Sequence, residues 1–130
     1  MIRIEVAPRL SQPGLDRLWR SAWGEPLANN YLERVLPRSL TYVGAFDEDR
    51  IVGFVNVAWD GAVHAFILDT CVDEDYRRQG IASKLVKRAA TAAKERGAAW
   101  LHVDFEPHLG TFYRTCGFRP TAAGLIALNM

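Results

Sequence analysis

The sequence is poor in cysteine and has no long apolar run. Its only two cysteines, Cys71 and Cys116, cannot form the disulfide framework of a small secreted protein, and their spacing fits no metal site. We therefore expect both to be small apolar side chains, and we expect no bound metal. No apolar stretch approaches the roughly 20 residues of a membrane-spanning helix, so we expect no membrane partner.

The chain also lacks an excess of either charge. Its net charge is +1, with 24% charged and 49% hydrophobic residues, which is typical of a soluble globular protein. This balance gives no overall electrostatic reason to bind nucleic acid. At this length we expect one domain, residues 1–130. The first residues alternate as a strand does, unlike a signal peptide, so we expect a cytoplasmic protein.

The first half of the chain predicts a strand, two helices and a three-stranded antiparallel meander. Ser11 can cap the first helix and Gly24 can end it, while Pro37 stops the second. Asp60-Gly61 is a two-residue hairpin signal between the last two strands. The expected elements are a strand at residues 2–6, helices at 11–23 and 26–36, and strands at 40–46, 51–59 and 63–72.

The second half changes to a helical period. From Ile81 the apolar residues form one stripe of a helix that Gly97 ends. The strand expected next, at residues 100–104, follows this crossover helix and should run parallel to the last meander strand. We expect a short helix at 109–116 and one or two strands in 118–128. The fold class is therefore α/β of the α+β type, with a mixed central sheet and flanking helices.

The junction before the long helix, residues 77–82, carries the clearest chemistry. The first N–H groups of a helix have no internal partner, and together with the helix dipole they form an anion site. Gly80 permits close backbone approach, and Arg77 and Arg78 add positive charge. The loop lacks the Gly-Lys-Ser/Thr of a Walker loop and the repeated glycines of a dinucleotide site. Taken alone, residues 77–82 are more simply interpreted as a basic loop that caps a helix than as a phosphate-binding site.

Its surroundings resemble the cofactor motif of the GNAT superfamily of N-acetyltransferases. The family pattern Arg/Gln-x-x-Gly-x-Gly/Ala is met by Arg77, Gly80 and Ala82. Phe112-Tyr113-Arg114-Thr115-Cys116-Gly117-Phe118 is similar to the closing signature of the family, and Ile51-Val52-Gly53-Phe54-Val55 to its strand before the hairpin. The resemblance covers residues 40–118 and implies a GNAT-like domain with a splayed parallel strand pair and acetyl-CoA as co-substrate.

The resemblance also implies where the coenzyme binds. In the family, pantetheine lies between the splayed strands and pairs with the third meander strand, while the pyrophosphate lies on the first amides of the following helix. The cofactor-binding residues implied here are Cys71, Val72, Arg77, Arg78, Gln79, Gly80, Ile81, Ala82 and Ser83.

Tyr113, Asp69 and Asp104 are the main candidates for catalysis, and His102 and His108 are further ones. In the family, a tyrosine at the position of Tyr113 often protonates the departing thiolate, although such a side chain beside Phe112 is also ordinary core packing. An amine with a pKa of about 10.4 must lose a proton before it attacks, which requires a base or a water chain. Asp69 and Asp104 are the best-placed carboxylates, and each could equally be structural. The Val72 N–H could stabilise the tetrahedral oxyanion.

The resemblance says less about where the amine acceptor binds. Glu106 stands where the family often has an asparagine that contacts pantetheine. Few residues follow Phe118, so part of the acceptor pocket could be open or come from a second subunit, which makes a homodimer possible. The acceptor could be a small-molecule or peptide amine held by the first helices, and the candidate side chains there are Trp19, Trp23, Glu25, Asn29, Asn30 and Tyr31.

The main prediction is an acetyl-CoA-dependent N-acyltransferase that works by direct transfer in a ternary complex. A non-catalytic acetyl-CoA-binding or regulatory module is the alternative, and the presence of Tyr113 favours the enzyme. A basic loop that binds other polyphosphates or nucleic acid is a third possibility, which the near-neutral charge disfavours.

Overall fold

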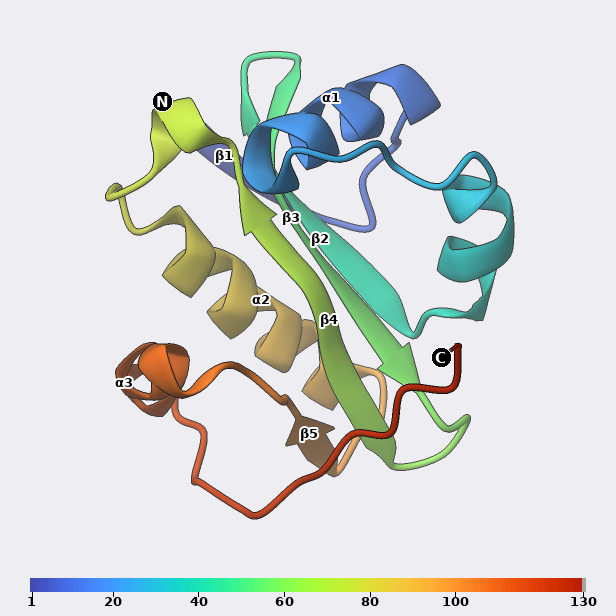
Figure 1. Ribbon diagram of the computed structural model, residues 1–130, viewed down its shortest axis with the longest axis vertical. Coiled ribbons are helices and arrows are strands. Elements are labelled where there is room, and N and C mark those ends of the chain that lie inside the picture. Colours follow the sequence, from blue (N-terminus) through green and yellow to red (C-terminus); the bar gives the residue numbers. More distant parts are fainter. Residues whose placement is uncertain (130) are drawn as a thin grey trace.

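The computed structural model describes residues 1–129 and contains a five-stranded sheet between helices (Figure 1). The strands are β1 (Ile2–Val6), β2 (Thr41–Asp47), β3 (Arg50–Trp59), β4 (His64–Val72) and β5 (Trp100–His102), and they lie in this order in the sheet. The helical elements are α1 (Gln12–Trp23), the π-helical turn η1 (Tyr31–Val35), the 3₁₀ turns η2 (Leu36–Arg38), η3 (Glu74–Tyr76) and η4 (Pro107–Leu109), and the helices α2 (Ile81–Glu95) and α3 (Gly110–Thr115).

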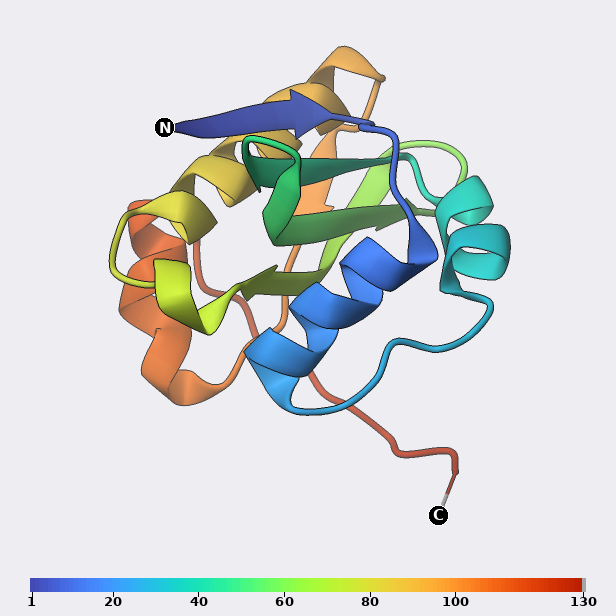
Figure 2. The same cartoon turned by 90° about the horizontal axis from the view of Figure 1, so that it is seen from above.

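The sheet separates two apolar cores (Figure 2). Helix α2 covers one face, where Leu85 and its neighbours pack against Val43 and Val55. Helix α1 covers part of the other face, where Leu15 and Leu18 pack with a second group of sheet residues. Both helices bury the apolar stripe that their sequence shows, which fixes their orientation on the sheet. Within residues 1–129, no helix has the length and apolar character needed to cross a membrane.

The predicted mixed sheet is confirmed, and its parallel pair is splayed. Strands β1 to β4 pair antiparallel, whereas β4 and β5 are parallel and joined through α2. The parallel pairing extends only from His64↔Trp100 to Phe66↔His102. In the described part of the chain, residues 67–72 of β4 therefore have β3 on one side and no strand on the other. This uncovered edge is where the site lies.

Two predictions in the first half were wrong in detail. No helix runs from residue 26 to 36, because Leu27 is held to α1 by the Asp16 carboxylate and only the short turns η1 and η2 follow. Asparagines before Tyr31 favour such a turn over a continuous helix. The hairpin after β3 is also wider than two residues, because the Asp60 side chain accepts N–H bonds from both Ala62 and His64.

The predicted strands in residues 118–128 are absent from the structure. The backbone there is irregular, and Leu125, Ile126 and Leu128 are 86%, 85% and 91% exposed. The segment Thr121-Ala122-Ala123-Gly124 has low strand propensity, and β5 is only three residues long, so it offers little edge for pairing.

Candidate active site

The N-terminus of α2 forms an open cradle of backbone amides. Gly80 is the N-cap, in the left-handed region at φ +77°, and no side chain caps the helix. A Cβ built on Gly80 would meet no atom within 4 Å, so the space above it is empty. The N–H groups of Ile81, Ala82 and Ser83 have no partner inside the helix. The predicted anion site is therefore geometrically present, and a glycine is needed there because an L side chain rarely adopts this backbone conformation.

A buried carboxylate holds the loop that leads into the cradle. Asp73 follows β4, is 1% exposed, and accepts hydrogen bonds from Arg17, Arg50 and the Asp75 N–H. Burial alone would raise the pKa of Asp73, but the Asp75 N–H and the Arg50 guanidinium outweigh it, and the pKa is lowered. Asp73 thus ties α1 and β3 to the start of the cofactor loop.

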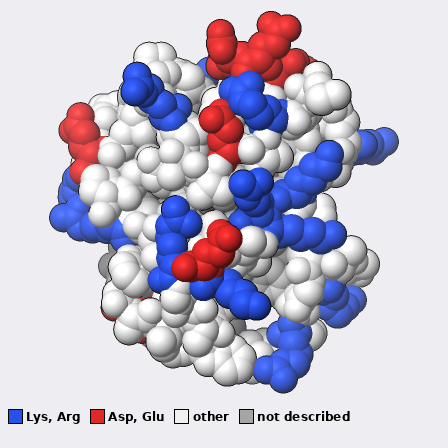
Figure 3. All heavy atoms as spheres, turned by 180° about the vertical axis from the view of Figure 1, so that it is seen from behind, with Lys and Arg blue, Asp and Glu red and all other residues white. Residues whose placement is uncertain are grey.

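The two arginines of the loop have different roles. The Arg77 guanidinium donates to the Ala22 carbonyl near the end of α1 at 3.1 Å, so it fastens the loop to that helix. Arg78 is exposed, with φ +64°. The face formed by the outer side of α2 is rich in basic side chains (Figure 3), including exposed Lys84 and Lys87. This concentration of positive charge beside the cradle suits an anionic ligand even though the net charge of the chain is only +1.

A cleft of about 500 Å³ connects the cradle to the uncovered edge of β4. Its wall contains Thr70, Cys71 and Val72 from β4 and Phe112 from α3. All the predicted cofactor-binding residues except Gln79 line it, and the full lining is Ala22, Trp23, Thr70, Cys71, Val72, Tyr76, Arg77, Arg78, Gly80, Ile81, Ala82, Ser83 and Phe112. The sequence therefore identified one continuous surface.

Backbone groups of Val72 point into this open edge. The Asp73 N–H donates to the Val52 carbonyl of β3 at 2.8 Å. Because successive N–H groups of an extended chain alternate in direction, the Val72 N–H and carbonyl face away from β3. They lie beyond the last pair of β4 and β5, so they are available to a ligand that extends the sheet. The backbone groups of Cys71 face β3 instead.

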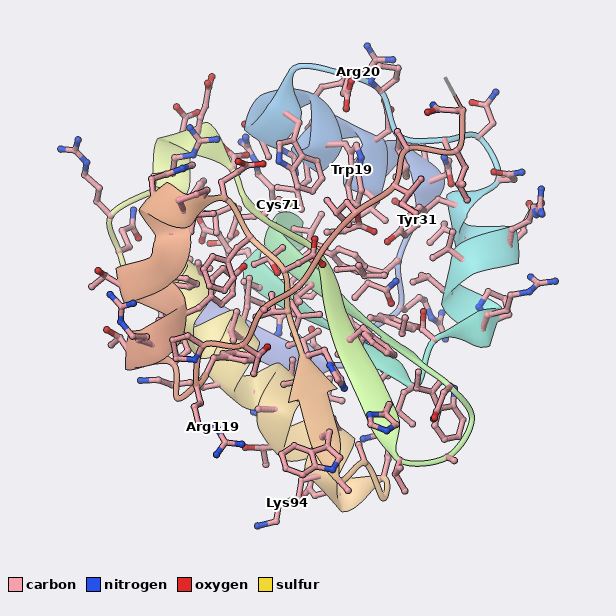
Figure 4. All side chains as sticks on the ribbon, turned by 60° about the horizontal axis from the view of Figure 1, so that its bottom comes forward. Trp19, Arg20, Tyr31, Cys71, Lys94 and Arg119 are labelled. Carbon is pink, nitrogen blue, oxygen red and sulfur yellow. The ribbon has the colours of Figure 1, made fainter. Side chains whose placement is uncertain are left out.

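A β-bulge in β4 places Asp69 beside the Cys71 face of the sheet. Between the pairs Asn56↔Leu68 and Phe54↔Cys71, β4 has one more residue than β3, and Asp69 has φ +59°. The Tyr31 hydroxyl donates to Asp69 Oδ2 at 2.8 Å. Burial and the Asp69 carboxylate raise the pKa of Tyr31, so the phenol stays protonated as the donor. Tyr31 and Trp19 belong to the same apolar core as Cys71, and Figure 4 labels all three.

Tyr113 is packed among aromatic rings next to the cleft. Its ring stacks on Phe105 at 4.7 Å and contacts Phe112 and Phe118 edge to face. Burial raises the pKa of Tyr113, the nearby Thr70 hydroxyl opposes this shift, and the Asp104 carboxylate adds to it. Tyr113 does not line the cleft directly, whereas its neighbours Thr70 and Phe112 do.

The described residues contain no metal-binding cluster, and the cysteine in the wall of the cleft, Cys71, is not set up as a nucleophile. Burial raises the pKa of the Cys71 thiol, which keeps it in the unreactive protonated form. Within residues 1–129, no group of three His, Cys, Asp or Glu side chains is close enough to hold a metal ion.

The structure brings some predicted residues together and leaves others apart. Asp104 and Glu106 are exposed beyond β5. His102 forms a hydrogen-bonded pair with His64 at 2.9 Å, at the far end of β4 from the cleft. Sequence reasoning missed the role of Asp73 as the loop anchor, although an aspartate directly after a strand is a recognisable cap signal. It missed the Tyr31–Asp69 bond because no sequence spacing encodes it.

This fold and cleft define the class of protein. A mixed sheet whose parallel pair splays, with an amide cradle at the N-terminus of the crossover helix, is the architecture of an acetyltransferase. A family profile described as "Acetyltransferase (GNAT) family" matches residues 12–118. The chain belongs to the acetyltransferase (GNAT) family, and the resemblance noted in the sequence is confirmed.

Solved structures support this assignment over the whole chain. A GNAT-family acetyltransferase from Streptococcus pneumoniae TIGR4 is 30% identical, with a TM-score of 0.78, and the match covers 99% of this chain and 98% of that one. AAC(6')-Iy, solved with a bisubstrate analogue containing coenzyme A, has the same fold with a TM-score of 0.78 at 16% identity over 98% and 97% of the two chains.

A curated relative matches over a shorter region. The chloroplastic GCN5-related N-acetyltransferase 2 of Arabidopsis thaliana is 27% identical over 78 residues, which are 60% of this chain. The match spans only 30% of the length of that relative.

Proposed function

We propose that this chain transfers the acetyl group of acetyl-CoA to an amine by direct attack within a ternary complex. The observation that carries the proposal is the continuous cleft from the open amides of α2 to the outward backbone of Val72. A cofactor with a phosphate end and an amide-bearing arm matches both ends of this surface.

The donor is held mainly by backbone groups. The pyrophosphate of acetyl-CoA accepts hydrogen bonds from the amides of residues 81–83, where the dipole of α2 favours negative charge. Arg78 and Lys84 add charge near these amides. An N–H of the pantetheine arm donates to the Val72 carbonyl, as a neighbouring strand would, which leaves the Val72 N–H free for the thioester oxygen. This arrangement leaves the thioester near Thr70, at the junction of the cleft and the bulge.

The reaction needs no covalent enzyme intermediate. The amine nitrogen attacks the thioester carbon, and the Val72 N–H stabilises the oxyanion that forms. Asp69, at the bulge next to the cleft, takes one proton from the incoming ammonium before it attacks, and the attached nitrogen then releases its second proton to solvent. Exposed Asp104 lies on the Tyr113 side instead. The C–S bond then breaks, and Tyr113 gives its proton to the thiolate. AAC(6')-Iy, which has the same fold, binds a bisubstrate analogue in which coenzyme A and an acceptor are joined in one molecule, and this is consistent with direct transfer.

Thiol release from acetyl-CoA across a panel of primary amines tests this proposal. Amine-dependent release, with the acetylated amine identified by mass spectrometry, is the expected result. The background without amine corrects for hydrolysis. Tight acetyl-CoA binding without release for any amine in the panel would instead favour a non-catalytic coenzyme-binding module.

A further inference from the structure

An exposed apolar strip continues from the cleft along β4. Leu68 and Phe66 are 42% and 38% exposed, and Phe66 is exposed although it has both β3 and β5 beside it, whereas Leu68 lies beyond the end of β5. Both side chains are on the α1 side, because their partners Asn56 and Ala58 lie two and four residues along β3 from Phe54, which is buried in the core under α1. Within residues 1–129, neither α1 nor the turns η1 and η2 cover the strip formed by Leu68 and Phe66, since both side chains remain exposed.

The bulge places a carboxylate on the same face as this strip. In a regular strand, successive residues point to opposite faces. The extra residue at the bulge allows both Leu68 and Asp69 to face the α1 side, where Asp69 meets Tyr31. Asp69 Oδ2 is held by the Tyr31 hydroxyl, and Oδ1 has no hydrogen-bond partner within residues 1–129. An anionic oxygen therefore stands between the cleft and the apolar strip.

We infer that the acceptor is a monocationic amine carried on an apolar body, with its nitrogen at Asp69 and its body on Leu68 and Phe66. This inference rests on the proposed acetyl transfer and specifies its substrate class. At neutral pH an alkylamine arrives as a cation, which Asp69 complements. Leu68 and Phe66 have no polar atoms, so hydroxyls or further charges of an acceptor would lose hydration there without gaining a partner.

The size of the strip limits the length of the body. Residues two apart on a strand are about 6.8 Å apart, so Leu68 and Phe66 span about one aromatic ring with a short alkyl chain. The next residue on this face of β4 is His64, which contacts His102 at 2.9 Å, and His102 on β5 stacks on Phe66 at 4.7 Å, so polar rings end the strip beyond Phe66. Figures 1 and 2 show residues 118–129 passing on this side of the sheet, and the two side chains remain exposed in their presence.

The test compares 2-phenylethylamine, which has an apolar body, with ethanolamine, which has a polar one. Both are primary amines of similar basicity. We expect kcat/KM to be at least about 10-fold higher for 2-phenylethylamine, the gain from burying part of a ring. Phe66→Ser should remove most of this preference, mainly by raising KM for 2-phenylethylamine. Binding of acetyl-CoA, measured by calorimetry, should not change.

Trp59→Ser is the matched control. Trp59 is also 38% exposed, but it pairs with Ala65, whose side chain lies in the core on the α2 face. The preference should survive in this variant.

Each alternative outcome has a separate meaning. Equal kcat/KM for the two amines, or a preference that Phe66→Ser leaves intact, would overturn the inference while acetyl transfer stands. If Phe66→Ser changes the oligomeric state but not the preference, the strip is a contact with a second copy, and the inference is also overturned. Absence of transfer to every amine would instead remove the proposed function itself.

Discussion

The two ends of the cleft are built in different ways. At the coenzyme end, backbone amides of α2 form the surface, and Asp73, Arg77 and Gly80 fix the loop before it. At the acceptor end, side chains form the surface, and a single bond from Tyr31 fixes Asp69 above an uncovered strip. A backbone site tolerates sequence change because most residues supply the same N–H group. The ligand preference of a site formed by side chains depends on which side chains are present.

This difference explains why the sequence indicates the coenzyme end, whereas the proposed acceptor end depends on individual side chains. Substitutions at the two ends should therefore have different consequences for binding of the coenzyme and of the amine. Variants at the coenzyme end should weaken acetyl-CoA binding for every amine, and variants at the acceptor end should alter the response to the amine alone.

Gly80→Glu should have the largest effect. The new side chain brings a carboxylate to the pyrophosphate site and strains the left-handed backbone, so acetyl-CoA affinity should fall by about 100-fold or more. Isothermal titration calorimetry measures this change. Gly97→Glu is the matched control, because Gly97 has φ +98° and equally open surroundings beyond the other end of α2. If both variants bind acetyl-CoA as the wild type does, the cradle is not the coenzyme site.

Tyr113→Phe should lower kcat by about 100-fold and leave the affinity for acetyl-CoA unchanged, because it removes only the proton donor. The ring contacts with Phe105 and Phe112 are retained. Steady-state kinetics with a saturating amine measure the effect. Tyr42→Phe, which removes a hydroxyl elsewhere in the sheet, provides the comparison. A variant as active as the wild type would show that another group protonates the thiolate.

Asp73→Asn should lower the free energy of unfolding by about 2 kcal/mol and raise KM for acetyl-CoA, because the loop loses hydrogen bonds to a charged anchor. The pKa of Asp73 is lowered in the folded state, so its contribution is complete above the unfolded pKa of about 3.9. This contribution disappears as pH falls through the lower folded pKa.

Urea unfolding of wild type and Asp73→Asn at several pH values checks the sign. The difference in the free energy of unfolding between the two proteins should narrow below about pH 4. A gap that widens there would rule out the anionic anchor. Asp75→Asn, at an exposed neighbour, should change little.

Tyr31→Phe should have the smallest effect, a loss of about 5-fold in kcat/KM for the amine, because Asp69 loses one hydrogen bond of about 1 kcal/mol. If Tyr31 acts through Asp69, the same change should have no further effect on kcat/KM in an Asp69→Asn background. Equal losses in both backgrounds would indicate a general packing role for Tyr31 instead.

The sequence predicted most of the sheet and grouped residues that lie along one cleft, because both depend on local patterns. Alternation and helical stripes are local, and so is the Arg77–Ala82 motif, which places its glycine at the one position that needs φ +77°. The helix over residues 26–36 was a wrong prediction because a contact from Asp16, distant in sequence, decides the path there.

The acceptor end could not be predicted because its features depend on register. The bulge between Leu68 and Cys71 is set by how β3 and β4 align, and it decides which face Asp69 occupies. The bond from Tyr31 spans 38 residues of sequence. The predicted strands of residues 118–128 failed because nothing in the sequence reveals how little edge β5 offers.

Direct transfer of acetyl to an amine is the central claim, and two-substrate initial rates combined with the intact mass of the protein test it most directly. A ternary complex predicts intersecting double-reciprocal lines, an acetylated amine as product and a protein whose mass never changes, in keeping with the buried protonated thiol of Cys71. Parallel lines with an acetylated protein would contradict the claim.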